Sequence, residues 1–312
     1  MTLGQLVDRF ESAERSIVVV NRTDPDPVQD MLVDTFGDDA VRVTERSANE
    51  TNGSVAPGLD AAVDAASAGI ADHPLDAAVL RDHDAVPFDG DRLADAENLV
   101  LLLEGDEVLA GSTLEELGDA ILFVNSDLYI TGTRAPGDLE LPSVITGLDD
   151  TVFTLRGYPE SNRQKLLLIT ISRFIERTAL AAGGGTLRSS FQRLSRLEDE
   201  LGTRRVYDRL ADGGVDAHLY GVPDDPPTGL EATIHGGRSS DFTDSWFVVF
   251  DPPGGPAAVD AETDLDRGVN GGVALLAVET EPRVWHGVWT FDPDRLRAIT
   301  RYIRRNLSTP AG

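Results

Sequence analysis

The segment from residue 162 to residue 181 constrains the fold of this chain most, because apolar side chains recur around most of its helical circumference. A surface helix carries its apolar residues on one stripe, so a helix with this pattern is expected to be buried. Pro159 and Ser161 precede the segment, and Gly183-Gly184-Gly185 follows it as a typical helix terminator. The segment is therefore predicted to be a long helix that other elements cover.

Strands are expected around this helix, because short apolar or alternating runs recur through residues 141–312. Residues 280–283 form a connection typical of a hairpin, and Asp292-Pro293 predicts the start of a final helix. These patterns predict an α+β domain at 141–312, in which helices flank an antiparallel sheet. Strands are expected at 152–155, 186–191, 215–220, 232–234, 246–250, 273–278 and 284–289, helices at 141–148, 194–201 and 205–211, and a mobile loop at 252–266.

Residues 1–140 are predicted to form a smaller acidic α/β domain, because a βαβ-like pattern opens this half of the chain. A turn-rich linker at 132–137 is expected to end it. The domain boundary is therefore placed at residue 140. Helices are expected at 3–13 and 28–37, strands at 17–20, 41–43, 77–80, 99–103, 121–124 and 128–130, and a loop at 47–58.

Acidic residues outnumber basic residues by 54 to 27, which gives a formal net charge of −27. Residues 1–140 hold 8 basic and 30 acidic residues (−22), and residues 141–312 hold 19 and 24 (−5). This surface repels polyanions, so direct binding to nucleic acid or to an anionic membrane is not expected. Asp and Arg dominate and Lys165 is the only lysine, a composition typical of a halophilic, archaeal protein.

The sequence has no cysteine, which excludes disulfides, thiolate nucleophiles and cysteine-based metal sites. The segment from Met1 to Ser16 does not resemble a secretory signal, and no apolar run approaches the length that spans a bilayer. A cytoplasmic protein is therefore expected. Glycine-rich phosphate loops and the G-x-S-x-G nucleophile motif are also absent, so no enzymatic activity is predicted and no cofactor is indicated.

Strand alternation places Asp216, His218 and Tyr220 on one face of the strand at 215–220. Together with His235 or His286, these side chains could form a metal or acid–base site. The alternative is a set of ordinary polar residues on a sheet face, which is the interpretation we favour, so no metal site is predicted.

Two tryptophans mark a candidate ligand site on the strand at 284–291. Trp285 and Trp289 share a face with Gly287 between them, and the glycine leaves a gap that could admit a planar ligand. The alternative is that a helix fills the gap and the rings are core. The ligand-binding candidates are Phe191, Gln192, Tyr220, Trp246, Trp285, His286 and Trp289.

Arginines crowd the predicted last helix. In so acidic a chain they could dock an acidic partner, or they could simply stabilise the helix end and pair with carboxylates. The partner-binding candidates are Arg295, Arg297, Arg301, Arg304 and Arg305.

Ordered segments between residues 148 and 306 resemble the DICT sensory domain, a domain found with diguanylate cyclases and two-component proteins. The segments are 153–162 (FTLRGYPESN), the helix at 166–180, 183–192 (GGGTLRSSFQ), 245–251 (SWFVVFD) and 288–293 (VWTFDP). The chain looks like the haloarchaeal stand-alone form. The resemblance implies an α+β sensory module that perceives a signal, with a light-linked signal as one option, and that has no enzymatic activity.

The resulting expectation is a cytoplasmic module that binds a small ligand or a partner and passes a conformational change to a separate signalling protein, such as a kinase or a transcriptional regulator. One alternative is an adaptor that binds proteins without any ligand. Another is a metal-dependent enzyme that uses Asp216, His218 and His235.

Overall fold

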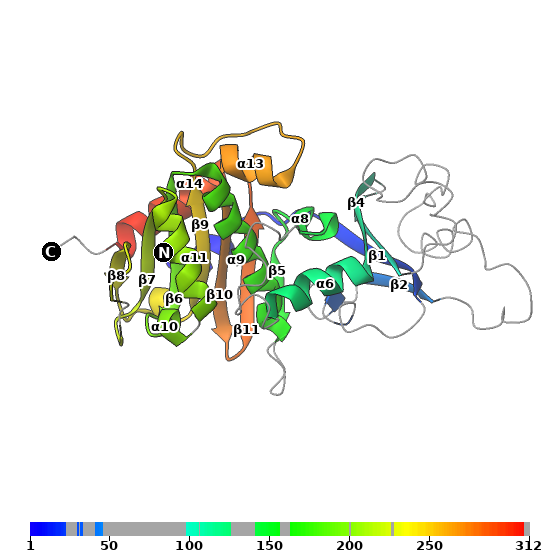
Figure 1. Cartoon of the computed structure of the whole chain (residues 1–312). Coiled ribbons are helices and arrows are strands. Elements are labelled where there is room, and N and C mark those ends of the chain that lie inside the picture. The colour runs from blue at the N-terminus through cyan, green and yellow to red at the C-terminus, as the bar shows by residue number, and fades with distance from the viewer. Residues whose placement is uncertain are drawn as a thin grey trace, which may run out of the picture. The chain divides into compact units, whose positions relative to one another are not determined.

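The computed structural model of the 312-residue chain describes residues 1–22, 30, 32–33, 41–45, 98–105, 107–125, 141–156, 163–199, 201–225 and 228–308. The chain forms two compact units, each built from discontinuous segments (Figure 1). The C-terminal unit comprises Met1–Ser12, Ile121–Glu140 and Val152–Gly312, and the N-terminal unit comprises Ala13–Ala120 and Leu141–Thr151. These units differ from the expected single boundary at residue 140.

The N-terminal unit contains a four-stranded sheet with the order β2-β1-β3-β4. β1 and β2 are parallel, as the βαβ-like pattern predicts, whereas β3 is antiparallel to β1 and β4. The strands predicted at 17–20, 41–43 and 99–103 are confirmed. The bounds are β1 Arg15–Arg22, β2 Val41–Glu45, β3 Leu99–Glu104 and β4 Glu107–Thr113.

The strand predicted at 121–124 is wrong, because these residues belong to helix α6 (Leu114–Asn125). A capping box begins the helix: the Glu116 backbone N–H donates to Thr113 Oγ1 at 3.0 Å, and the Thr113 N–H donates to the Glu116 carboxylate at 2.8 Å. A short apolar run alone does not separate helix from strand. The predictions for 47–58, 77–80, 128–130, 132–137 and most of 28–37 lie outside the described residues.

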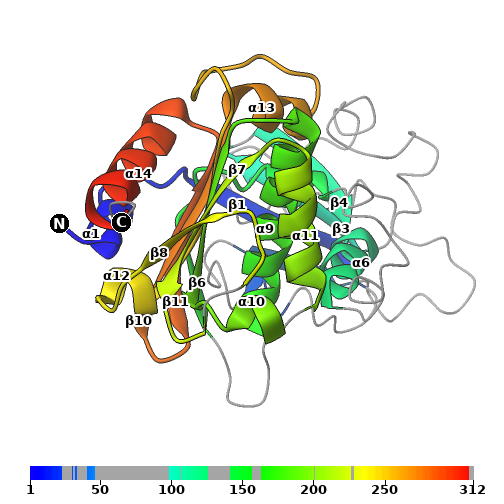
Figure 2. The same cartoon turned by 60° about the vertical axis from the view of Figure 1, so that its left-hand side comes forward.

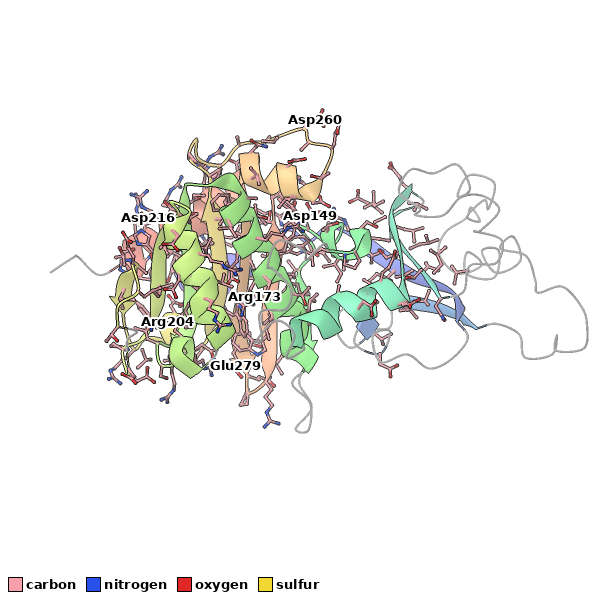
Figure 3. The ribbon with its side chains drawn as sticks, in the orientation of Figure 1. Asp149, Arg173, Arg204, Asp216, Asp260 and Glu279 are labelled. Atoms are coloured by element: carbon pink, nitrogen blue, oxygen red, sulfur yellow. The ribbon has the colours of Figure 1, made fainter. Side chains whose placement is uncertain are left out.

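Arg15 explains why residues 141–151 belong to the N-terminal unit. Its guanidinium donates to the backbone carbonyls of Gly147 and Asp149 and to the Asp149 carboxylate, where the pair measures 2.8 Å. Both side chains are largely buried, and Asp149 is labelled in Figure 3. Ser143, in helix α8 (Ser143–Thr146), donates to the Gly111 carbonyl of β4 at 2.6 Å. The helix expected at 141–148 is thus present, in a shorter form, and is attached to this sheet.

The C-terminal unit contains a seven-stranded sheet with the order β5-β11-β10-β9-β6-β7-β8. The α+β class is confirmed, but the sheet is mixed, because β6, β7 and β8 run parallel to one another. Helices α10 and α11 supply the crossover that the parallel pair β6–β7 requires. The bounds are β5 Phe153–Arg156, β6 Thr186–Arg193, α10 Arg196–Asp199, α11 Leu201–Asp212, β7 Asp216–Val222, β8 Thr233–Gly236, β9 Ser245–Asp251, β10 Val273–Glu281 and β11 Val284–Thr290.

One face of this sheet is covered by α9 (Arg163–Ala182) and α11, and α13 (Asp264–Gly271) lies at the top beside α9, as Figure 2 shows. Helix α9 confirms the predicted buried helix: Leu168 and Ile175 are completely buried. It ends at Gly183, which takes a φ of 62°. The loop expected at 252–266 is interrupted by α13, which begins at Asp264 because Thr263 Oγ1 caps the Asp266 N–H at 3.1 Å.

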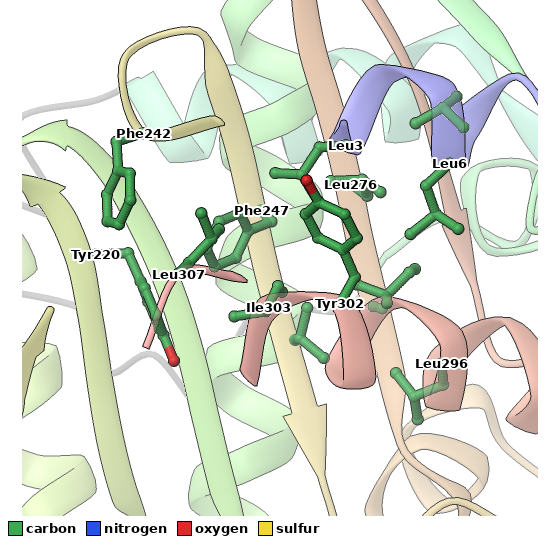
Figure 4. Close-up of a cluster of buried hydrophobic side chains, with 14 residues drawn as sticks. Leu3, Leu6, Tyr220, Phe242, Phe247, Leu276, Leu296, Tyr302, Ile303 and Leu307 are labelled. Carbon is green, nitrogen blue, oxygen red and sulfur yellow. The ribbon is translucent and has the colours of Figure 1, made fainter. Parts of the chain in front are cut away.

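The opposite face carries α1 (Leu3–Val7), α12 (Ser240–Thr243) and α14 (Pro293–Asn306). Asp292 caps α14 as predicted and accepts from the Asp294 and Arg295 N–H groups at 2.9 and 2.8 Å. Helix α1 is shorter than the expected 3–13. A hydrophobic cluster joins α1, α14 and the sheet (Figure 4); it includes Leu3, Leu6, Val7, Phe247, Leu276, Leu296, Ile299, Tyr302, Ile303 and Leu307.

Candidate anion-binding site

The tryptophan face of β11 is packed core. Trp285 and Trp289 are each 1% exposed, and the Trp289 ring meets Phe174 of α9 edge to face at 6.2 Å. A Cβ on Gly287 would lie 2.7 Å from the Cβ of Ala277 on β10. The glycine therefore permits close approach of two strands. Of the two interpretations of this face, the structure supports the packed core and not a pocket.

The remaining ligand-binding candidates do not form one site. The Trp246 indole N–H donates to Ser172 of α9 at 3.0 Å, and Phe191 packs edge to face on Tyr207 of α11 at 5.5 Å. Tyr220 lies on the opposite face of the sheet, in the hydrophobic cluster. On that same face, His286 Nδ1 lies 3.3 Å from Thr154 Oγ1. The Gln192 side chain accepts from Arg196 in α10.

Asp216, His218 and Tyr220 do share a face, as strand alternation predicts. His218 Nε2 lies 3.0 Å from the Asp216 carboxylate, and His218 Nδ1 lies 2.9 Å from His235 Nε2. The Tyr220 ring stacks on His235 at 4.5 Å. Over the described part of the chain, however, no group of three or more His, Asp or Glu side chains could hold a metal ion.

The arginines of α14 divide into two groups. Arg295 donates to the Glu11 carbonyl at 2.7 Å, and its guanidinium lies over the Phe10 ring at 5.4 Å. Arg297 pairs with Asp294 at 2.6 Å and donates to the Pro256 carbonyl at 2.9 Å. Both are therefore engaged within the chain. Arg301, Arg304 and Arg305 are exposed and form no ion pair with any described carboxylate.

These three arginines line a hollow of about 650 Å³, which we call the arginine hollow. It lies where β6 begins and β9 ends, beneath one side of α14 and beside the loop that follows β9. The hollow thus brings together segments that are far apart in the sequence. Its lining consists of Thr186, Arg188, Asp251, Pro252, Pro253, Gly255, Pro256, Arg297, Thr300, Arg301, Arg304 and Arg305.

The inner end of the arginine hollow is a largely buried polar network, in which Arg188 Nε has no hydrogen-bond partner among the described residues. Arg188 pairs with Asp251, and their side chains are only 8% and 14% exposed. Thr300 Oγ1 lies 3.1 Å from both Asp251 carboxylate oxygens. Burial raises the pKa of the Asp251 carboxyl above its ordinary value, although the Arg188 guanidinium and the Thr300 hydroxyl oppose the shift.

The outer end of the arginine hollow concentrates positive charge in an acidic protein. Guanidinium groups bind carboxylates and phosphates through paired N–H donors, and unpaired ones keep those donors free. In a chain where acidic residues outnumber basic ones by two to one, three guanidinium groups around one hollow that form no ion pair within the described residues are not explained by general charge balance. The arrangement is suited to hold a small anion.

Sequence reasoning missed part of this site. It named Arg297, Arg301, Arg304 and Arg305 as candidates for a partner surface, but it did not select Arg188, Asp251 or Thr300. The available signal was the alternation in β6, which places the polar side chains of Thr186, Arg188 and Ser190 on one face of the strand. Arg188 and Asp251 are separated by 63 residues, so their pairing is a product of the fold.

Comparison with models of known protein families gives no match, and comparison with curated proteins gives none either. The resemblance to the DICT sensory domain therefore stays a prediction. None of the described helices is long and apolar enough to cross a membrane. What the fold and the site define is an α+β protein with a cationic hollow where two central strands of its larger sheet end, at the start of β6 and the end of β9.

Proposed function

We propose that this chain is a non-enzymatic signal-sensing module that binds a small anionic ligand in the arginine hollow. The observation that supports it is the set of three exposed guanidinium groups, Arg301, Arg304 and Arg305, which line a common hollow and form no ion pair with a described carboxylate. Because unpaired like charges repel one another, binding an anion between them relieves that repulsion and stabilises the native state.

Helix α14 is the element that would transmit the signal. One side of it lines the arginine hollow, and the other side packs into the hydrophobic cluster with Leu3 and Leu6 of α1. The Tyr302 hydroxyl donates to the Asp241 carboxylate and lies 2.8 Å from the Met1 carbonyl oxygen. A ligand that shifts α14 would therefore change the packing of α1, and a separate protein such as a kinase or transcriptional regulator would recognise that change.

The sensory role, the cytoplasmic location and the adaptation to high salt belong to the same proposal. The DICT-like segments and the acidic, lysine-poor composition support them. Binding energy in molar salt must come from direct hydrogen bonds, because the Debye length there is only about 3 Å. Guanidinium groups that contact the anion directly meet this requirement.

The second candidate function is a ligand-independent adaptor, in which the same three exposed arginines dock an acidic protein. The location of Arg301, Arg304 and Arg305 around a concave site favours a small ligand, because a flat surface would be sufficient for an acidic protein. The two functions predict different results with small anions: the adaptor requires no stabilisation by any of them.

The test is a thermal unfolding series of the full chain with inorganic pyrophosphate. Pyrophosphate is expected to raise the Tm of the wild type and to have no effect on the triple variant R301A/R304A/R305A. The matched control is R205A/R209A/R238A, which removes the same charge from exposed positions outside the hollow and should respond like the wild type.

Two further readings complete the test. Amide exchange in α1 should change when pyrophosphate binds, and the pyrophosphate should be recovered unhydrolysed. An equal loss of response in both triple variants, or no response in the wild type, would contradict the proposed ligand site. Turnover of the anion, abolished by a single substitution in the hollow, would contradict the non-enzymatic role.

A further inference from the structure

The arginine hollow has two chemically different ends, and this difference indicates what the ligand is. The outer end presents Arg301, Arg304 and Arg305 to solvent. The inner end presents one carboxylate, Asp251, together with the hydroxyls of Thr186 and Thr300. A ligand that occupies the whole hollow must match both ends at once.

The inner end does not suit a second phosphate group. The Asp251 carboxylate would lie beside it, and like charges at short range repel strongly in a partly buried site. Arg188 already pairs with Asp251 through one terminal nitrogen, so its positive charge does not offset that of a second anion, although its Nε–H has no hydrogen-bond partner in the described part of the chain. A hydroxyl group fits this end better, since it can donate to the Asp251 carboxylate or to Thr300 Oγ1 and accept from the Thr186 hydroxyl, whereas the Thr300 hydroxyl already donates to Asp251.

The walls of the hollow argue against a flat aromatic ligand. Among the described lining residues there is no aromatic ring on which a nucleobase or a flavin could stack. One wall is instead formed by Pro252, Pro253 and Pro256, whose rings offer small apolar surfaces to aliphatic C–H groups. The volume of about 650 Å³ lies within the range of small-molecule sites and accommodates a sugar-sized ligand.

From these three features, and resting on the proposed function, we propose that the ligand is a phosphorylated polyol such as a sugar phosphate. Its phosphate is held by Arg301, Arg304 and Arg305, and its hydroxyl groups are held by Asp251, Thr186 and Thr300. The carboxylate of Asp251 thus selects for the polyol part of the ligand, while the arginines supply the affinity for phosphate.

Titration calorimetry on the full chain tests this assignment with four probes: inorganic phosphate, ribose, ribose phosphorylated on its terminal carbon, and adenosine monophosphate. The phosphorylated ribose is expected to bind at least about tenfold more tightly than inorganic phosphate, because its hydroxyls add hydrogen bonds to a charged group. Ribose alone should not bind measurably. Adenosine monophosphate should bind no more tightly than the phosphorylated ribose.

Single substitutions test which residues produce the preference for phosphorylated ribose over inorganic phosphate. D251N is expected to reduce the affinity for phosphorylated ribose to that for inorganic phosphate, and to strengthen the binding of inorganic phosphate slightly by removing the negative charge. Because D251N leaves Arg188 without its ion partner, T186V and T300V serve as a second pair that keeps the Arg188–Asp251 ion pair. Each should reduce the preference for phosphorylated ribose several-fold and leave inorganic phosphate unchanged.

The outcomes separate this inference from the proposed function. If the arginine variants abolish phosphate binding but phosphorylated ribose binds no better than phosphate, the anion site stands and the polyol assignment fails. If adenosine monophosphate binds about tenfold more tightly than phosphorylated ribose, the ligand is a nucleotide and the assignment fails as well. If no phosphate-containing probe binds, the proposed anion-binding function is itself contradicted, and the polyol assignment falls with it.

Discussion

The two faces of the seven-stranded sheet differ in composition although they share one set of strands. On the face covered by α9 and α11, Trp289, Leu187 and Phe250 are fully or almost fully buried. On the opposite face, a single cross-strand row runs from Val249 on β9 through Arg188 and His218 to Thr233 on β8. Side chains on this face therefore become polar where the sheet passes from β9 to β8.

On the face opposite α9 and α11, the change from apolar to polar side chains coincides with the place where the covering helices end. Helix α14 packs over β9 and β10, where Val249, Ala274 and Leu276 enter the hydrophobic cluster. Towards β7 the same face is open enough that the Asp216 side chain is 63% exposed. The face covered by α9 and α11 therefore supplies tightly packed core, whereas the polar groups of the candidate site lie on the other face, at the margin of the hydrophobic cluster.

The largest expected effect is on the buried face. Trp289→Ala should lower the free energy of unfolding by about 3–5 kcal/mol, because it removes a 1% exposed indole from a packed contact with Phe174. Urea unfolding of the full chain measures the change. If the variant remains folded, its affinity for pyrophosphate should equal that of the wild type; a selective loss of binding would place the site on the wrong face.

A smaller effect is expected for Gly287→Ala. The added Cβ would lie 2.7 Å from both the Ala277 Cβ and the Leu276 carbonyl oxygen, so the strands must move apart at a cost of about 1–3 kcal/mol. Gly254→Ala is the matched control, since an added Cβ there has no neighbour within 4 Å. Equal unfolding midpoints for the two variants would mean that the tryptophan face contains room that the packing does not indicate.

The smallest effect concerns Asp251 and pH. Its native pKa lies above the ordinary value of 3.8 because of burial, so between those two pKa values the native state binds more protons than the unfolded chain. The contribution of Asp251 to stability therefore falls as pH rises through this window. The facing groups, Arg188 and Arg304, stay charged throughout.

The measurement is the difference in unfolding free energy between the wild type and D251N from about pH 4 to pH 7. The wild type should lose stability relative to D251N as the pH rises. Loss of the ion pair with Arg188 shifts this difference by a constant and does not change its slope. A difference that is independent of pH would place Asp251 in a more solvated environment than its burial indicates.

The spacing of apolar residues predicted much of this fold, because the burial of a helix or strand is reflected in the order of polar and apolar residues along that element. The apolar circumference of α9 and the alternation of Trp285 and Trp289 each report the surroundings of one element, and the structure confirms both. The strand predicted at 121–124 failed because a short apolar run fits either element, and the parallel pairing of β6 with β7 depends on a crossover that alternation does not encode.

Only part of the candidate site could be predicted from the sequence, because the other part depends on the pairing of distant strands. Arg301, Arg304 and Arg305 recur at helical spacing, so the sequence alone predicts that their charges lie on one side of the helix. Their inner counterparts, Arg188 and Asp251, each occupy an unremarkable strand position, and only the antiparallel pairing of β6 with β9 brings them together. The tryptophans attracted attention instead because large aromatic residues line both pockets and cores.

The chain passes between its two units at residues 12/13, 120/121, 140/141 and 151/152. Truncation or gene fusion that treats residue 140 as a border would consequently separate α1 from α14. Leu3, Leu6 and Val7 would be lost from the cluster, and an apolar stripe on α14 and the sheet would face water. A recombinant fragment that starts at residue 141 is therefore a damaged protein rather than an isolated domain, and a soluble one would need the first twelve residues restored, in trans or by a linker.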